Sequence, residues 1–243
     1  MATNDRKTVR LPLLALRGVV LFPQMVLHFD IGREKSIYAL NEAMNQDRII
    51  FLAAQKDIRD EDPEGNDIYQ VGVVAEVKQI IETQNHLRVL VEGRYRARIL
   101  RIEEEEPYFV ATVEEYPLKS SRSTNQKMMS ALMRTLKDLF QEYSMKTPRM
   151  SKDLVFNALA AENPEYLTEY IAANMPIHTD DKQMVLEESS VTKRLKMLIQ
   201  ILEEENEILS LEQEIQEKVR NQIDNNQREY YLREQMKAIS SEL

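Results

Sequence analysis

The stretch IYQVGVVAEVKQIIETQNHLRVLVEGRYRARILRI, residues 68–102, contains two long runs rich in β-branched residues, with only ETQNH between them. A third run, YFVATVEEY at residues 108–116, follows Pro107. Runs of this composition joined by short connections favour neighbouring antiparallel strands. The stretch therefore predicts an antiparallel meander, which gives the first half of the chain the character of a sheet.

Three arginines, Arg94, Arg96 and Arg98, occupy every second position of the second run. This is the period expected of a strand with one solvent-exposed face. The arginines have two interpretations: they keep that face soluble, or they form a face that binds an anionic ligand. Because the acidic residues 103–106 follow directly and would neutralise the arginines, the solubility interpretation is favoured.

The sequence before the meander predicts further strands and one helix. Residues 9–32 indicate two short strands broken by Pro12, Gly18 and Pro23. The other elements expected here are a helix at 33–46, a buried strand at 48–55 and a polar loop at 56–67.

The second half of the chain predicts helices, because all five glycines and the β-rich runs lie in the first half. Helix starts are marked by Ser151, by Asn163 before Pro164, and by Thr179 with Asp180. The amphipathic helices expected are at residues 128–146, 151–161, 164–175 and 179–189. The fold class is therefore α+β, a β-rich N-terminal part followed by a helical bundle.

A long helix is predicted from about Ser190 to Leu243, because no Gly or Pro interrupts this segment. At about 1.5 Å per residue it would be roughly 80 Å long, more than a small bundle requires. Beyond Leu209 its apolar stripe becomes narrow, so we expect this part to project and to pair along one seam. The residues expected to serve pairing or assembly are Leu211, Ile215, Val219, Ile223, Tyr230, Tyr231 and Met236.

The composition narrows the class of protein. A formal net charge of −9 disfavours binding to nucleic acid, which depends on Lys and Arg. The absence of cysteine excludes disulfides and thiolate metal sites and fits a reducing cytoplasm. Neither a signal peptide nor a run of about 18 apolar residues is present, so we expect a cytoplasmic protein without membrane contact.

Sequence motifs for catalysis are lacking. No phosphate loop of the type G-x-x-x-x-G-K-[ST] and no G-x-S-x-G motif occurs. The three histidines, His28, His86 and His178, are too scattered in sequence to suggest a metal pair. We therefore expect no catalytic residue and no metal site in this chain.

Five blocks stand out in the sequence: LPLLALRGVVLFPQMVLHFDIGREKSIYALNEAM (11–44), FLAAQKD (51–57), VLVEGRYRARIL (89–100), IAANMPIHTDDKQMVLEE (171–188) and QREYYLREQMKAISSEL (227–243). In this order they closely resemble the N-terminal region of the ATP-dependent Lon protease family. Together they cover essentially the whole chain. One departure is the turn with Thr83, Gln84 and Asn85, where members of the family often have a Pro-Asp-Gly type hairpin.

The resemblance implies a β-rich domain of the PUA-like type, a helical bundle, and a long helix leading to an AAA+ ATPase and a Ser-Lys protease domain. Those catalytic domains are not in this sequence, so ATP and Mg²⁺ are expected to bind outside it. The domains expected are a β-rich substrate-binding domain at 1–118, a linker at 119–127, a bundle at 128–200 and the long helix at 201–243.

The resemblance also implies a function: substrate recognition and assembly for a hexameric ATP-dependent serine endopeptidase that degrades misfolded, damaged and short-lived regulatory proteins. The expected partners are unfolded or degron-bearing proteins. Such partners share exposed apolar side chains, so a receptor needs apolar patches set among charges. The candidate substrate-binding residues are the turn Leu21, Phe22, Pro23 and Met25 and the charged helix start Arg33, Glu34 and Lys35.

Each candidate has a structural alternative. Burial under the following helix is favoured for the apolar turn, and electrostatics of a helix start is favoured for the charged cluster. The alternative function for the whole chain is a stand-alone scaffold or adaptor in which the long helix forms a coiled-coil oligomer. Because the seam is short and its flanks are polar, the isolated chain is expected to form at most a weak dimer.

Overall fold

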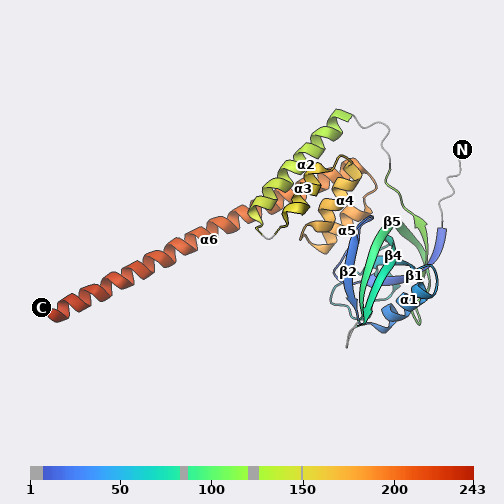
Figure 1. Ribbon diagram of the computed structural model, residues 1–243, viewed down its shortest axis with the longest axis horizontal. Coiled ribbons are helices and arrows are strands. Elements are labelled where there is room, and N and C mark those ends of the chain that lie inside the picture. Colours follow the sequence, from blue (N-terminus) through green and yellow to red (C-terminus); the bar gives the residue numbers. More distant parts are fainter. Residues whose placement is uncertain (1–7, 83–86, 120–125, 149) are drawn as a thin grey trace.

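The computed structural model describes residues 8–82, 87–119, 126–148 and 150–243 (Figure 1). The strands are β1 (Thr8–Leu16), β2 (Val26–Ile31), β3 (Ile49–Ala54), β4 (Val71–Glu82), β5 (Leu87–Glu104) and β6 (Phe109–Glu115). The helices are α1 (Glu34–Asn45), α2 (Gln126–Lys146), α3 (Lys152–Ala160), α4 (Pro164–Asn174), α5 (Thr179–Glu187) and α6 (Val191–Glu242), with a 3₁₀ turn η1 (Gly65–Asp67). The predicted α+β organisation, sheet first and helices later, is confirmed.

The predicted meander is confirmed, since β4, β5 and β6 pair antiparallel in sequence order. Its first turn, with Thr83 to Asn85, lies outside the described residues. The sheet order is β2-β5-β4-β3-β1-β6, and β6 also pairs with β5. These pairings close β5, β4, β3, β1 and β6 into a ring, because β5 contacts β4 along one edge and first β2, then β6, along the other.

Both faces of the sheet are buried at β3 and over most of β1, which explains why these two strands read as almost continuous apolar runs. In β1, Leu11 and Leu13 belong to one cluster of buried side chains, and Leu14 and Leu16 belong to a second. This alternation follows from the period of two along a strand. The second cluster continues into α1 and into the helical half of the chain.

Pro12 does not break a strand, which corrects the prediction. It lies within β1 and is aligned with Val110 of β6, while the pairing of β1 with β3 begins only at Leu13. A proline is compatible with a strand where one side of the backbone lacks a hydrogen-bonding neighbour. Position 12 meets that condition because it has a register partner on β6 alone.

The helical half begins with α2 and ends with α6, and the two pack side by side (Figure 1). The start of α4 has the predicted cap: the side-chain oxygen of Asn163 accepts hydrogen bonds from the backbone N–H of Glu165 and Tyr166, at 2.7 and 3.1 Å. Pro164 occupies the first helical position, where its missing N–H costs nothing.

The predicted long helix is confirmed as α6, which has 52 residues and a length of about 80 Å. Its first part is packed, with Leu195, Leu198 and Leu202 fully buried. From Leu211 to Leu243 every residue is exposed, and this part projects away from the rest of the molecule (Figure 1). The predicted division at residue 200 falls inside this continuous helix.

The predicted linker at 119–127 lies mostly outside the described residues. Its first residue, Lys119, forms a parallel bridge with Ser190 and donates its backbone N–H to the carbonyl oxygen of Ser189 at 2.8 Å. The chain that leaves the sheet is therefore attached to the turn between α5 and α6.

Candidate functional site

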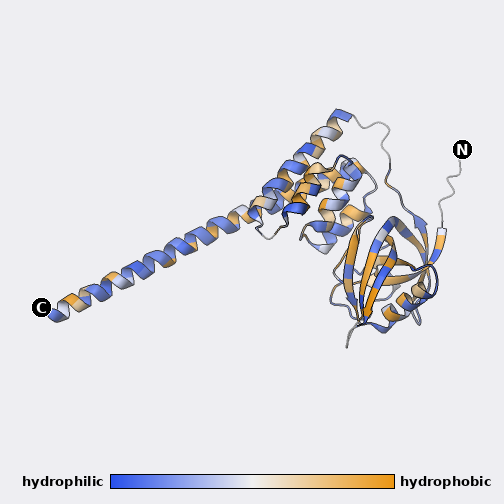
Figure 2. Ribbon diagram, in the orientation of Figure 1, coloured by the Kyte–Doolittle hydropathy of each residue, from blue (hydrophilic) through white to orange (hydrophobic). Residues whose placement is uncertain are grey.

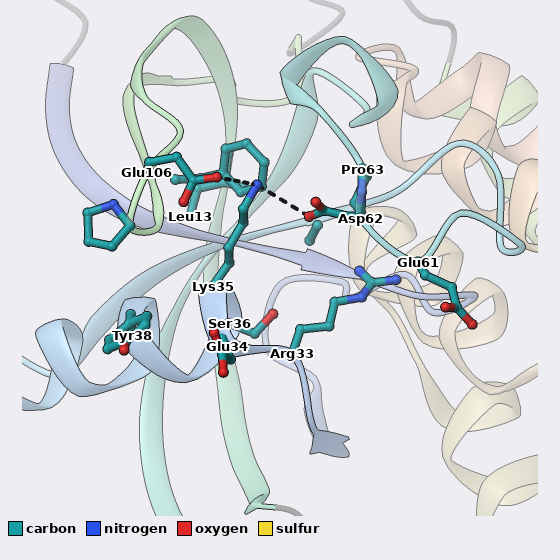
Figure 3. A pocket seen from close by; sticks show the side chains of 13 residues that line it. Leu13, Arg33, Glu34, Lys35, Ser36, Tyr38, Glu61, Asp62, Pro63 and Glu106 are labelled. Carbon is teal, nitrogen blue, oxygen red and sulfur yellow. Dashed lines mark ion pairs between the residues drawn. The ribbon is translucent and has the colours of Figure 1, made fainter.

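The charged start of α1 lies at an open pocket of about 350 Å³ (Figure 3). Four parts of the chain meet there: the end of β1, the start of α1, the loop between β3 and β4, and the turn between β5 and β6. The predicted residues Arg33, Glu34 and Lys35 all line this pocket. The structure thus brings one of the two predicted groups to a cavity.

The pocket has an apolar floor and a charged rim. Leu13, Ala15 and Phe109 are buried side chains of the smaller apolar cluster, and they contribute the floor with Pro63. Tyr38, one turn after Lys35 on α1, is 51% exposed. The acidic residues of the rim are Glu34, Glu61, Asp62 and Glu106.

Lys35 of α1 forms ion pairs with both the β3–β4 loop and the β5–β6 turn. Its Nζ lies 2.9 Å from Oε1 of Glu106 and 3.2 Å from Oδ1 of Asp62, and it is 5.4 Å from the centre of the Phe109 ring (Figure 3). The hydrogen bond to Glu106 is the main reason why the pKa of Lys35 is raised. Because the side chains of Asp62 and Glu106 are 78% and 75% exposed, these ion pairs contribute little to the stability of the fold.

Arg33 is held by neutral acceptors. Its Nη1 donates to the side-chain oxygen of Gln55 at 2.8 Å, and its Nη2 donates to the backbone oxygen of Asp60 at 2.9 Å. Burial, followed by the nearby Arg17, lowers the pKa of Arg33. A second cavity of about 280 Å³ shares Ala15, Arg33 and Ser36 with the first, so the open surface continues towards β2.

The other predicted group, the apolar turn, does not form a surface patch. Leu21, Phe22 and Pro23 are buried, and only Met25 is partly exposed. The chain reverses direction at Pro23 and Gln24. Gln24 has a φ of +60°, and a proline followed by a residue of positive φ is typical of a type II turn. Burial, the alternative favoured from the sequence, is therefore what the structure shows for Leu21, Phe22 and Pro23. Leu21 and Phe22 belong to the larger core cluster.

Gly93 is the reason why the turn fits against β5. A Cβ at this position would lie 2.4 Å from the carbonyl oxygen of Phe22, which is too close for any other residue. The backbone N–H of Gln24 donates to the carbonyl oxygen of Gly93 at 2.8 Å, and the N–H of Gly93 donates to the carbonyl oxygen of Met25 at 2.9 Å. The main chain of the turn is thus bonded directly to β5.

The three alternating arginines of β5, Arg94, Arg96 and Arg98, which we call the arginine ladder, divide into ion-paired and buried residues. Arg94 pairs with Glu76 at 2.7 Å and Arg98 pairs with Glu114, both at partly exposed positions. Arg96 is only 4% exposed and forms no part of a soluble face, so the solubility interpretation is wrong for this residue. The residues next to Arg96 in sequence did not indicate its burial. The segment that covers Arg96 is the turn after α5, which is distant in sequence.

Arg96 and Arg194 of α6 bind the same two backbone carbonyls. Nη1 of Arg96 donates to the oxygens of Leu186 and Glu188 at 2.5 and 2.9 Å, and Arg194 donates to the same oxygens at 3.0 and 2.7 Å. Arg194, with no exposed side-chain area, also bonds Glu169 of α4 at 3.0 Å. We call Arg96, Arg194 and Glu169 the arginine junction. It joins β5, α4, the end of α5 and α6.

Burial and like charge act on the arginine junction together. Burial, followed by the proximity of Arg194, lowers the pKa of Arg96 to about 10. Burial raises the pKa of Glu169, while Arg194 opposes that effect. Even so, Arg96 stays charged near neutral pH and supplies charge-assisted hydrogen bonds to the carbonyls.

The predicted assembly residues are exposed on the projecting part of α6. Their exposed fractions run from 50% to 70%, for Leu211, Ile215, Val219, Ile223, Tyr230, Tyr231 and Met236. They lie on the part of α6 that was expected to project, whereas their role in pairing stays a prediction. In Figure 2 this part of α6 is mainly hydrophilic with separated hydrophobic positions.

Across residues 8–82, 87–119, 126–148 and 150–243, no group of three His, Asp or Glu is arranged to hold a metal ion. No helix in the same part of the chain combines the length and the apolar character needed to cross a membrane.

The described residues thus combine a closed sheet, an open pocket with an apolar floor, and helices that extend into a long rod. The family model for the "ATP-dependent protease La (LON) substrate-binding domain" matches residues 10–204. The chain therefore belongs to the Lon substrate-binding domain family. This assignment supports the Lon interpretation over a stand-alone coiled-coil scaffold.

Relatives and solved structures agree with the assignment. The chain is 45% identical to a Lon protease of Heliobacterium modesticaldum over 98% of its length, and 39% identical to Lon protease 1 of Bacillus subtilis over 100% of its length. It spans 29% and 31% of those two proteins. The N-terminal domain of the Mycobacterium avium complex Lon protease has the same fold, with a TM-score of 0.63 and 21% identity, covering 80% of this chain and 98% of that domain.

Proposed function

We propose that this chain captures unfolded or degron-bearing polypeptides for an ATP-dependent Lon-type protease. The observation that carries the proposal is the pocket at the start of α1, in a chain that belongs to the Lon substrate-binding domain family. In this role it would serve the removal of misfolded, damaged and short-lived regulatory proteins in the cytoplasm. Proteolysis would be the activity of the whole protein.

The pocket suits an unfolded polypeptide for a physical reason. An unfolded chain exposes apolar side chains in no fixed order, so a receptor that is too specific in shape would reject most of its substrates. The open floor with Phe109 accepts an apolar side chain, and Tyr38 extends this surface at the edge. The surrounding charges of Arg33, Glu34 and Lys35 keep the exposed apolar area small.

Cofactor binding and catalysis are assigned to other parts of a Lon-type protease. The sequence lacks a phosphate loop, and the described residues lack a cluster of metal ligands, so no residue of this chain is proposed to bind ATP or Mg²⁺. Under the proposal the chain itself is not an enzyme. Its contribution to activity is the local concentration of substrate.

Assembly is a second part of the proposal. A Lon-type protease would form a homo-hexamer, and the projecting part of α6 offers a seam of separated apolar side chains for contact with another helix. The side chains that carry this seam are Leu211, Ile215, Val219 and Ile223, followed by Tyr230, Tyr231 and Met236. No contact with nucleic acid or with a membrane is proposed.

Photo-cross-linking tests substrate capture at the pocket. A photoreactive phenylalanine analogue replaces Tyr38 in one variant and Phe156 of α3 in a matched control, since both positions are exposed aromatic residues. With denatured casein we expect several-fold more cross-linking from position 38 than from position 156, and competition by unlabelled denatured protein. Equal cross-linking from the two positions would contradict a binding site at the pocket.

A further inference from the structure

Negative charges outnumber positive charges around the pocket, and this excess affects which polypeptides the pocket can bind. Four carboxylates line the pocket, Glu34, Glu61, Asp62 and Glu106, against two cations, Arg33 and Lys35. The cavity and its apolar floor make the site, and the charges on its rim decide which flanking residues a bound segment can carry.

Both cations are already bonded within the protein. Lys35 lies between two carboxylates, and Arg33 donates to an amide oxygen and a backbone oxygen. An acidic residue of a ligand would have to displace these partners before it gained a cation. It would also approach the remaining carboxylates, which is unfavourable.

The carboxylates are less fully engaged. Asp62 and Glu106 share the single ammonium group of Lys35 and are largely exposed. Glu34 and Glu61 form no ion pair within the part of the chain that the structure describes, and both are exposed. A lysine or arginine of a ligand would therefore find free acceptors on the rim without displacing any existing cation.

The positions of the acidic residues on the rim fit a ligand that carries lysine or arginine. Figure 3 shows Glu61 and Asp62 on the β3–β4 loop and Glu106 on the opposite side, with Lys35 reaching between them. Two acidic loops thus border the apolar floor from different directions. A segment that places an apolar side chain on the floor brings its neighbouring side chains close to one loop or the other.

We propose that this pocket selects segments of unfolded polypeptide in which an apolar side chain lies next to lysine or arginine. The inference rests on the proposed function and adds a charge preference to it. Each exposed ion pair on the rim is weak, so a peptide that forms two of them should bind about fivefold more tightly than its neutral counterpart. The preference should shrink in about 1 M salt, where the screening length is only about 3 Å.

Fluorescence anisotropy with three labelled peptides measures this preference. The peptides share the same apolar residues, and their flanking positions carry lysine, glutamine or glutamate. For the natural chain we expect affinity to fall in that order. In the rim variant Glu61→Gln/Asp62→Asn/Glu106→Gln only Glu34 remains against Arg33 and Lys35. We therefore expect the lysine peptide to lose its advantage over the glutamine peptide, with the affinity of the glutamine peptide unchanged.

A matched control removes the same charge elsewhere. Glu212→Gln/Glu217→Gln/Asp224→Asn lies on the exposed part of α6 and changes the net charge of the chain by the same amount. It should retain the full preference for the lysine peptide. If the control loses the preference as the rim variant does, the effect comes from net charge and the proposal is overturned.

Lys35→Met provides a test of opposite sign. Methionine keeps the aliphatic length while leaving Asp62 and Glu106 without their internal cation, so affinity for the lysine peptide should rise. A fall would overturn the charge preference. If all three peptides bind the natural chain equally, the preference fails while capture stands. If none binds, capture itself fails.

Discussion

The two parts of α6 form one continuous helix but differ in their apolar stripe and in the residues that surround them. Between Val191 and Asn206 the helix buries six residues against its neighbours, whereas from Leu211 onward it buries none. The apolar side chains of the outer part are therefore not what keeps it helical. Glu, Gln and Lys with high helix propensity support it. So do pairs one turn apart, such as Glu214 with Lys218 at 2.5 Å.

One substitution repeated in both parts of α6 gives the largest expected contrast. Leu198→Ala removes a fully buried side chain and should lower the free energy of unfolding by about 3 kcal/mol, because it leaves a cavity. Leu211→Ala, at a position that is 52% exposed, should change it by less than about 0.5 kcal/mol. Urea unfolding followed by circular dichroism measures both. Equal losses would mean that the outer part is packed in solution.

Two arginines of the same strand give the next contrast: Arg96 is buried in the contact with the turn before α6, whereas Arg94 lies at the surface. Arg96→Gln should destabilise the chain by about 2 kcal/mol, because buried carbonyls at Leu186 and Glu188 each lose a charged donor. Arg94→Gln, two residues away at the surface, should cost well under about 1 kcal/mol. Thermal denaturation of the two variants side by side separates these cases. A neutral Arg96→Gln would show that Arg194 alone holds the junction.

Substitutions in the outer part of α6 should have the smallest effect on the stability of the chain and a measurable effect on its self-association. Ile215→Ser/Val219→Ser removes two seam side chains without touching the packed part of the helix. Sedimentation across a concentration series should show weak self-association of the natural chain and none for the variant, with the main unfolding transition unchanged. Tight association at nanomolar concentration would instead favour the scaffold interpretation.

Local patterns were sufficient to predict most of the elements. The runs in 68–102 predicted the meander, and the absence of breakers after Ser190 predicted α6. These features depend on residues close in sequence, where period and propensity act. Pro12 was misinterpreted because its effect depends on where the pairing with a distant strand begins.

The candidate site was predictable only in part for the same reason. Lys35 was identified from the charged start of a helix, but its partners Asp62 and Glu106 come from two other elements. Arg96 resembled its exposed neighbours until a segment ninety residues later covered it. Acidic residues in both bordering loops were a usable signal for the pocket rim, whereas no local signal marked the arginine junction.

The arginine junction and the exposed part of α6 are connected by one unbroken helix, and this gives the molecule a lever. The fulcrum lies near Arg194, where α6 is bonded to the turn that also carries Arg96 of the sheet. From Arg194 to Glu242 the helix extends by about 72 Å at about 1.5 Å per residue. A tilt of about 5° at Arg194 would displace the far end by about 6 Å, so a small movement of the sheet is magnified at a distance.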